Sequence, residues 1–230
     1  MGHEVIFLQA NSKIVGKIRN IIFDLGGVLF DIDYHKTADA FKDLGLKDFT
    51  QLYTQLKQHH LFDELETGRI SAEEFRRQIR DLSHKNLSDS EIDSAWNAIL
   101  IGIPDRNAVL LEKLQNEFDL FLLSNTNEIH ERAFRGFEGK NYGFDKIEDH
   151  FNKVYLSHHI GMRKPDQEIF MHVLKENNLS PHETIFIDDS PQHVAGALKL
   201  GIRALLLSKG EWVGDLLSKY MKEEAVRNNH

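Results

Sequence analysis

The chain has 230 residues and no cysteine, which excludes disulfide frameworks, thiolate nucleophiles and cysteine-based metal sites. It carries 36 Asp and Glu against 28 Lys and Arg, a formal net charge of −8, and this acidic balance argues against a general nucleic-acid binder. At the usual ~150 residues per domain, the length fits one domain with an insertion or two small domains. Catalysis by such a chain must use Asp, Glu, His, Ser or Lys.

The two ends of the chain carry no pattern that indicates chemistry. Residues 1–17 lack a basic n-region, and the apolar run at 5–8 is too short for a signal peptide. No apolar run approaches the ~18–20 residues that span a bilayer. We therefore expect a cytoplasmic protein without membrane or nucleic-acid partners. We also expect a leader over 1–17 and a tail over 216–230, frayed and polar from Lys222 onward.

Short apolar runs recur along the chain and stop at polar or small residues, and segments with helical spacing separate the later runs. Near-continuous hydrophobicity is what strands require when they are buried on both faces of a parallel sheet. We therefore predict an α/β fold with a doubly wound, Rossmann-like parallel sheet. Its strands are expected at residues 18–23, 120–123, 154–156, 184–187 and 202–207.

Residues 34–103 differ in character from the rest of the chain. Their apolar residues recur at helical spacing, and the segment Ser71-Ala72-Glu73-Glu74 has the pattern of a capping box at a helix start. We predict a small helical domain here, inserted into a core of residues 18–33 and 104–215, with hinges at 31–35 and 99–104. The apolar positions are Ala38, Phe41, Leu44, Phe49, Leu52, Tyr53, Leu56, Phe75, Ile79, Leu82, Ile92, Trp96 and Ile99.

Polar side chains follow three of the predicted strands at the point where each strand ends. Ligands bind beyond the carboxyl ends of the strands in open parallel sheets. We therefore expect these side chains to share one site with a lysine that precedes a predicted helix. The residues are Asp24, Ser124, Asn125, Asp188 and Asp189, with Lys164 as the cation.

These residue types suit phosphate chemistry. A divalent cation such as Mg²⁺ relieves the repulsion among crowded carboxylates by binding one or two of them and a phosphate oxygen. Lys164 would add a point charge to the same phosphate, and Ser124 with backbone N–H groups would hold its remaining oxygens. Asp24 can then attack phosphorus, which gives an aspartyl-phosphate that water hydrolyses.

Four segments of the chain resemble, in the same order, the four motifs of the haloacid dehalogenase (HAD) superfamily. Ser124 lies 100 residues after Asp24, which leaves room for an inserted C1-type helical cap, and the later gaps of 40 and 24 residues also suit that family. The resemblance covers about residues 18–210, and the first motif is similar to that of the bacterial α-glucose-1-phosphate phosphatase branch. The segments are Phe23-Asp24-Leu25-Gly26-Gly27-Val28, Leu122-Leu123-Ser124-Asn125, Arg163-Lys164-Pro165-Asp166 and Ile187-Asp188-Asp189-Ser190.

The resemblance implies a Mg²⁺-dependent phosphatase that acts on a small phosphorylated metabolite, such as a sugar phosphate. It makes Asp24 the nucleophile and gives Lys164 the task of steadying both the nucleophile and the phosphate. Ser124 and Asn125 would bind the phosphate. Nothing in the sequence indicates the oligomeric state.

The same resemblance implies the metal ligands. These are Asp24, the backbone carbonyl of Gly26 and Asp189, while Asp188 supports them without contacting the metal. Gly26 departs from the family pattern, because most phosphatases of this superfamily have an Asp there that protonates the leaving group. The loss of a positioned general acid typically costs about 10²–10⁴ in rate for a poor leaving group.

We consider two explanations for the missing acid. The substrate can have a good leaving group, as a sugar 1-phosphate does, or another group can act as the acid. The candidates are Asp31, Asp33 and a residue of the cap. The loop around Gly68, which carries Glu66, Thr67 and Arg69, is expected to be solvated.

Two other functions are compatible with these residues. A 2-haloacid dehalogenase attacks carbon with the same aspartate and uses no metal; Gly26 permits this, but the pair Asp188-Asp189 would repel an acid substrate. A regulatory protein that binds phosphate without turnover would keep the fold and lack the acid. The phosphatase is the function that the four motifs favour.

Overall fold

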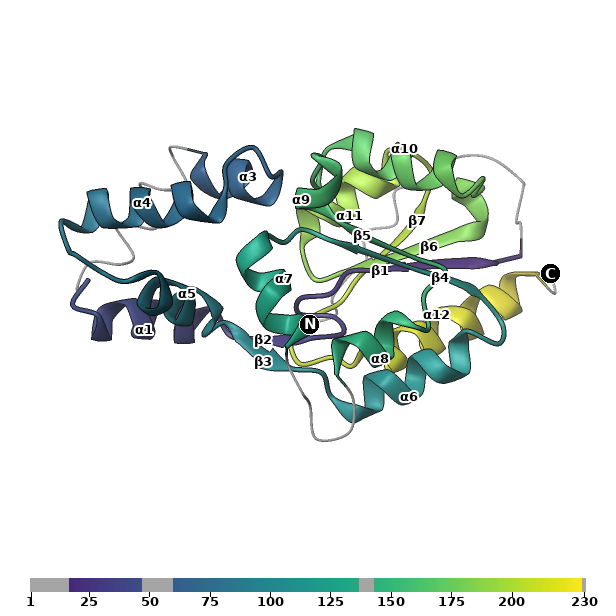
Figure 1. Cartoon of the computed structure of the whole chain (residues 1–230). Helices are drawn as coiled ribbons and strands as arrows, with labels where there is room; N and C mark the ends of the chain where they lie inside the picture. The colour runs from purple at the N-terminus through teal and green to yellow at the C-terminus, as the bar shows by residue number, and fades with distance from the viewer. Residues whose placement is uncertain (1–16, 47–59, 137–142, 229–230) are drawn as a thin grey trace, which may run out of the picture.

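The computed structural model describes residues 17–46, 60–136 and 143–228 (Figure 1). Within these ranges five parallel strands form one sheet in the order β5-β4-β1-β6-β7. Each strand overlaps one of the predicted apolar runs, which confirms the predicted parallel sheet. The bounds are β1 (Asn20–Phe23), β4 (Asp119–Ser124), β5 (Lys153–Leu156), β6 (Thr184–Asp188) and β7 (Arg203–Leu206).

The sheet is buried on both faces, as its apolar strands require. Ile21 and Phe23 of β1 pack into one hydrophobic core, and Ile22 between them packs into the other. The first core includes side chains from α6 (Asp105–Leu114), α7 (Glu128–Arg135), α8 (Phe144–Glu148) and α12 (Val213–Asn228). The second is covered by α10 (Gln167–Glu176) and α11 (Pro191–Leu198). The short helices α9 (Ser157–Ile160) and η1 (Pro181–Glu183) complete this doubly wound α/β fold.

Between β2 (Asp31–Ile32) and β3 (Leu100–Gly102) the described residues form four helices that share a third hydrophobic cluster, and we call them the helical insert. They are α1 (Tyr34–Asp43), α3 (Leu61–Glu66), α4 (Ala72–Ser83) and α5 (Asp89–Asn97), and Figure 1 shows them beyond one end of the sheet. A short antiparallel ribbon of β2 and β3 joins the insert to the sheet. The predicted apolar positions Phe49, Leu52, Tyr53 and Leu56 lie outside the described residues.

Helix capping in the insert follows the sequence only in part. Ser71 caps α4 as predicted, because its hydroxyl accepts the N–H of Glu74 at 3.2 Å. The carboxylate of Glu74 instead accepts hydrogen bonds from Arg77 and Gln78. A capping box with both reciprocal bonds occurs at Ser88 and Glu91, where α5 begins.

The expected frayed tail is wrong, because α12 continues through Asn228. Leu217 is buried in the first core, and Glu224 is buried and ion-paired with Arg203 of β7. The lysine and glutamate content of this segment masked apolar residues that pack on the sheet. In the part of the chain that is described, no helix is long and apolar enough to cross a membrane. The predicted leader falls almost wholly on residues that are not described.

Candidate active site

Three neighbouring strands carry polar side chains to one end of the sheet. Asp24 follows the last residue of β1, Ser124 ends β4, and Asp188 ends β6. Because β1 lies between β4 and β6, these strand ends are adjacent. The N–H of Asp24 also bonds to the carbonyl of Ile187 at 2.9 Å, which extends the ladder to the site. The parallel register therefore brings together residues that are distant in sequence.

Lys164 is the centre of the hydrogen-bond network. Its Nζ donates to Oδ1 of Asp24 at 2.7 Å, to Oδ2 of Asp188 at 2.7 Å and to the carbonyl of Leu123 at 2.8 Å. The lysine side chain is fully buried, so the three donors of the ammonium have three protein acceptors. The aromatic ring of Phe186 lies 5.4 Å from the same nitrogen. Lys164 is thereby fixed between two carboxylates.

Asn125 positions the backbone of Lys164. Its Nδ2 donates to the carbonyl of Lys164 at 2.9 Å, and its Oδ1 accepts the N–H of Lys164 at the same distance. This reciprocal pair ties the end of β4 to the segment that follows α9. Direct contact of Asn125 with phosphate stays a prediction, whereas its hold on Lys164 is a feature of the structure.

Asp188 has a structural task besides its contact with Lys164. Its Oδ1 accepts the N–H of Ser190 at 2.8 Å and lies 3.0 Å from Nδ1 of His193. The side chain of Ser190 makes no capping bond to α11. Ser190 is thus the N-cap residue of α11, and Asp188 holds its backbone N–H.

The acidic residues of the site shift one another's pKa values. Burial and the neighbouring aspartates raise the pKa of Asp24, although Lys164 opposes the shift. Burial also opposes ionisation of Asp188, but Lys164 and His193 keep the pKa of that carboxyl below its ordinary value. Burial and the charge of Asp188 raise the pKa of Asp189. The protein alone thus leaves the negative charge of this cluster incompletely balanced.

This donor set fits a hard divalent cation. Carboxylate oxygens from Asp24, Asp188 and Asp189 all lie within 4.8 Å of one another. Mg²⁺ prefers oxygen ligands, and its charge would offset the repulsion that raises two of these pKa values. The backbone approaches closely at Gly27, whose φ is +79° and where an added Cβ would lie 2.3 Å from Oδ2 of Asp189. Only glycine leaves room for Asp189 there.

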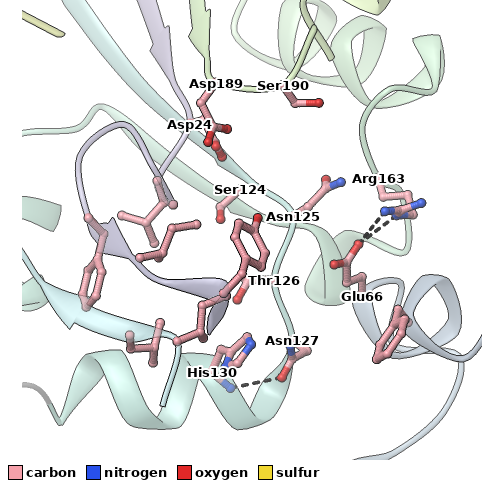
Figure 2. A pocket seen from close by; sticks show the side chains of 18 of the residues that line it. Asp24, Glu66, Ser124, Asn125, Thr126, Asn127, His130, Arg163, Asp189 and Ser190 are labelled. Atoms are coloured by element: carbon pink, nitrogen blue, oxygen red, sulfur yellow. Dashed lines mark hydrogen bonds and ion pairs between the residues drawn. The ribbon is translucent and has the colours of Figure 1, made fainter. Parts of the chain in front are cut away.

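The cluster opens into a cavity of about 870 Å³ between the sheet and the helical insert. Asp24, Asp189 and Ser124 line it from the sheet side, and Figure 2 shows Asp24 and Asp189 side by side. Glu66 and Trp96 line it from the insert. A small molecule that binds the carboxylate cluster therefore also meets side chains of the insert.

Glu66 corrects an expectation from the sequence. It is the last residue of α3, lines the cavity and bonds to Arg163 through Nε at 2.9 Å and Nη2 at 2.7 Å. Burial raises its pKa, although Arg163 opposes the shift. The expected solvated loop is thus wrong for Glu66, while Arg69 is exposed.

His130 is a cavity residue that the sequence analysis missed. It lies on α7, its Nδ1 is 2.9 Å from Oδ1 of Asn97, and its ring stacks on Trp96 at 5.2 Å. Asn97 and Trp96 both belong to α5, so His130 forms a second contact between the sheet domain and the insert. Its position within an amphipathic helix was the available signal, but periodicity alone cannot show which neighbour a helix face meets.

Two proposed replacement acids are not in the cavity. Asp33 caps α1, where its Oδ1 accepts the N–H of His35 at 3.0 Å, and Asp31 is exposed on β2. Neither belongs to the residues that line the cavity. Of the three candidates named from the sequence, only a residue of the insert, such as Glu66, faces the site.

The sequence matches the family of haloacid dehalogenase-like hydrolases over residues 18–201. The chain belongs to this family. A D-ribitol-5-phosphate phosphatase of Bacteroides thetaiotaomicron is 34% identical over 86% of this chain and 97% of its own length. The match therefore covers the helical insert as well as the sheet.

Two solved structures are similar along nearly the whole chain. A HAD family enzyme of Bacteroides thetaiotaomicron in complex with magnesium and inorganic phosphate shows 38% identity and a TM-score of 0.78, and the match covers 86% of this chain and 98% of that one. A predicted HAD-like family hydrolase of Porphyromonas gingivalis shows 33% identity and a TM-score of 0.79, with 89% and 98% covered. The HAD fold expected from the four motifs is confirmed.

Proposed function

We propose that the protein is a Mg²⁺-dependent phosphatase that hydrolyses a small phosphorylated metabolite through an aspartyl-phosphate on Asp24. The contact between Lys164 and Asp24 carries this proposal. Lys164 occupies Oδ1 of Asp24, whereas Oδ2 has no hydrogen-bond partner among the described residues. Oδ2 is therefore the oxygen available for attack on phosphorus.

The chain's own residues account for the positioning steps. Lys164 holds the plane of the Asp24 carboxylate, and its charge offsets that of the incoming phosphate. Ser124, buried at the end of β4 and lining the cavity, can donate its hydroxyl to a phosphate oxygen. Attack forms the bond from Oδ2 to phosphorus and breaks the bond from phosphorus to the ester oxygen, which takes up a proton from solvent and leaves as the alcohol. Water then cleaves the acyl phosphate, which returns the carboxylate, inorganic phosphate and a proton.

The metal would be held by Asp24, the backbone carbonyl of Gly26 and Asp189, with Asp188 orienting Lys164. When bound, Mg²⁺ supplies charge neutralisation for the carboxylates and the phosphate. A solved relative that contains both magnesium and phosphate supports this assignment. The three crowded carboxylates of this chain support it independently.

The substrate proposal follows the relatives and the cavity. One relative is a D-ribitol-5-phosphate phosphatase, so a phosphorylated polyol or sugar is the first compound to test. The helical insert, proposed as a cap over residues 34–103, supplies the cavity wall that faces the non-phosphate part of the substrate. The cytoplasmic location and the absence of nucleic-acid or membrane partners stay predictions from the sequence.

The decisive experiment combines a nucleophile variant with metal removal. We expect Asp24→Asn to lower phosphate release from D-ribitol 5-phosphate by at least ~10³-fold, because an amide is a poor nucleophile. Asp31→Asn is the matched control, since Asp31 is exposed outside the cavity. EDTA should abolish turnover and Mg²⁺ should restore it. Activity that survives Asp24→Asn would refute the proposal, and phosphate release that survives EDTA would refute the need for Mg²⁺. Release of halide from a 2-haloacid in EDTA would favour the dehalogenase alternative.

A further inference from the structure

The wall of the cavity opposite the carboxylate cluster carries two hydrogen-bond acceptors that have no partner in the described parts of the chain. The first is Oε1 of Glu66, because both bonds from Arg163 end on Oε2. The second is Nε2 of His130, because the ring uses Nδ1 for its contact with Asn97. Figure 2 shows Glu66 and His130 around the same opening as Ser124 and Asn125.

The hydrogen-bond roles of both groups follow from their partners. Asn97 presents Oδ1, an acceptor, so Nδ1 of His130 is the protonated nitrogen and Nε2 is left with a lone pair. Burial lowers the pKa of His130 to about 3, which agrees with a neutral ring. The two bonds from Arg163 favour the ionised form of Glu66, and an ionised carboxylate has no proton to donate, so it can only accept hydrogen bonds. Oε1 of Glu66 and Nε2 of His130 are therefore both free to accept a hydrogen bond from a ligand.

The charge of this wall is negative. Asp63 and Glu66 line the cavity, and Arg163, which bonds to Asp63 through Nη1 at 2.7 Å, is the cation between them. Among the described residues of the wall the formal charge is thus −1 with the histidines neutral. Arg163 is already paired on both sides, so it is not available to bind a second anionic group. A carboxylate or a second phosphate on the substrate would be repelled here.

We infer that Glu66 and His130 accept hydrogen bonds from hydroxyl groups of the substrate, so that the site selects phosphate esters of neutral polyols and sugars and rejects esters whose organic part is apolar or anionic. The inference rests on the proposed phosphatase function and adds the groups that determine specificity. Buried acceptors lose free energy when a ligand leaves them without donors, and this penalty is what discriminates against an alkyl chain.

The test compares three substrates that share the phosphate and differ in the organic part. D-ribitol 5-phosphate offers hydroxyl donors, 1-pentyl phosphate offers a chain of equal length with none, and 3-phosphoglycerate carries a carboxylate. We expect the wild type with Mg²⁺ to prefer the ribitol ester by roughly 10-fold or more in kcat/KM. Glu66→Gln should lower kcat/KM for the ribitol ester roughly 10- to 100-fold and that for the pentyl ester less than about threefold.

Removal of the negative charge gives a second readout that a purely structural role would not move. Glu66→Gln should raise the ratio of kcat/KM for 3-phosphoglycerate to kcat/KM for the ribitol ester, because the wall then no longer repels the carboxylate of 3-phosphoglycerate. His130→Phe keeps an aromatic ring against Trp96 and removes the acceptor, so it should also lower turnover of the ribitol ester selectively. Glu64→Gln is the matched control on the same helix, since Glu64 does not line the cavity. Thermal melts identify any variant that is not folded.

The possible failures are distinguishable. Equal loss on the ribitol and pentyl esters in Glu66→Gln would overturn the inference, because the effect of Glu66 would then not depend on substrate hydroxyls, while the phosphatase proposal would stand. Equal wild-type rates on all three esters would overturn the inference as well. No turnover of any ester by the wild type, with or without Mg²⁺, would overturn the proposed function and the inference together.

Discussion

Nζ of Lys164 lies 2.7 Å from Oδ1 of Asp24, and the two side chains are 0% and 11% exposed. A buried ammonium at this distance holds the carboxylate in one orientation and leaves its second oxygen toward the cavity. The same ammonium contacts Asp188, which belongs to a different strand. One lysine thus sets the geometry of the proposed nucleophile and of the strand ends around it.

Replacement of Lys164 should destabilise the protein as well as inactivate it. In Lys164→Met two buried carboxylates lose their counterion, which typically costs about 3 kcal/mol or more. Lys153→Met is the control, because Lys153 is 43% exposed and its ion pair with Glu176 contributes less than about 1 kcal/mol. Urea unfolding in EDTA measures the free energy of unfolding of both variants. Equal midpoints for the two variants would contradict the structural importance of the buried pair.

Gly27→Ala should weaken Mg²⁺ binding more than it weakens the fold. A Cβ at this position would lie 2.3 Å from Oδ2 of Asp189, so the carboxylate must move. Displacement of a ligand group typically lowers metal affinity about 10-fold or more. Gly210→Ala is the matched control, because Gly210 has a similar φ of +83° and no atom within 4 Å of an added Cβ. Calorimetric titration with Mg²⁺ should separate the two variants.

The sequence was sufficient to predict the sheet and the catalytic end of it. Apolar runs buried on both faces have few alternatives, and polar residues directly after parallel strands must share one edge. Glu66 was placed in a solvated loop because its partner, Arg163, is 97 residues away and no local pattern links them. The hydrogen bond from Lys164 to Asp188 has no local pattern either, because the two residues are 24 positions apart in the sequence.

His130 predicts a dependence of stability on pH. Its pKa is about 3 in the folded state and near 6.5 when unfolded, because burial opposes the charged ring. Below pH 6.5 the unfolded chain binds a proton that the folded chain does not, so this contribution is lost as the pH falls from 6.5 toward 3. The slope is at most about 1.4 kcal/mol per pH unit.

The variant His130→Phe isolates this titration. As the pH is lowered from 6.5 to about 4, its free energy of unfolding should fall less steeply than that of the wild type. The contributions of the other titrating groups cancel in the difference between the two curves. Chemical denaturation at several pH values measures both curves. Parallel curves would show that His130 titrates normally in the folded protein.

Gly26→Asp tests whether the missing acid limits the chemistry. An added Cβ at Gly26 would lie 3.4 Å from Cδ1 of Ile32, which is an ordinary contact, and Gly26 does not have a positive φ. Since Gly26 lines the cavity, the new carboxyl can reach the leaving group. We expect Gly26→Asp to raise turnover of alkyl phosphates roughly 10-fold or more and to flatten the dependence of rate on leaving-group pKa. Gly26→Ala supplies the same Cβ without the acid and should do neither. An unchanged, steep dependence in Gly26→Asp would mean that protonation of the leaving group comes from elsewhere in the cavity, and it would remove the reason to expect substrates with good leaving groups.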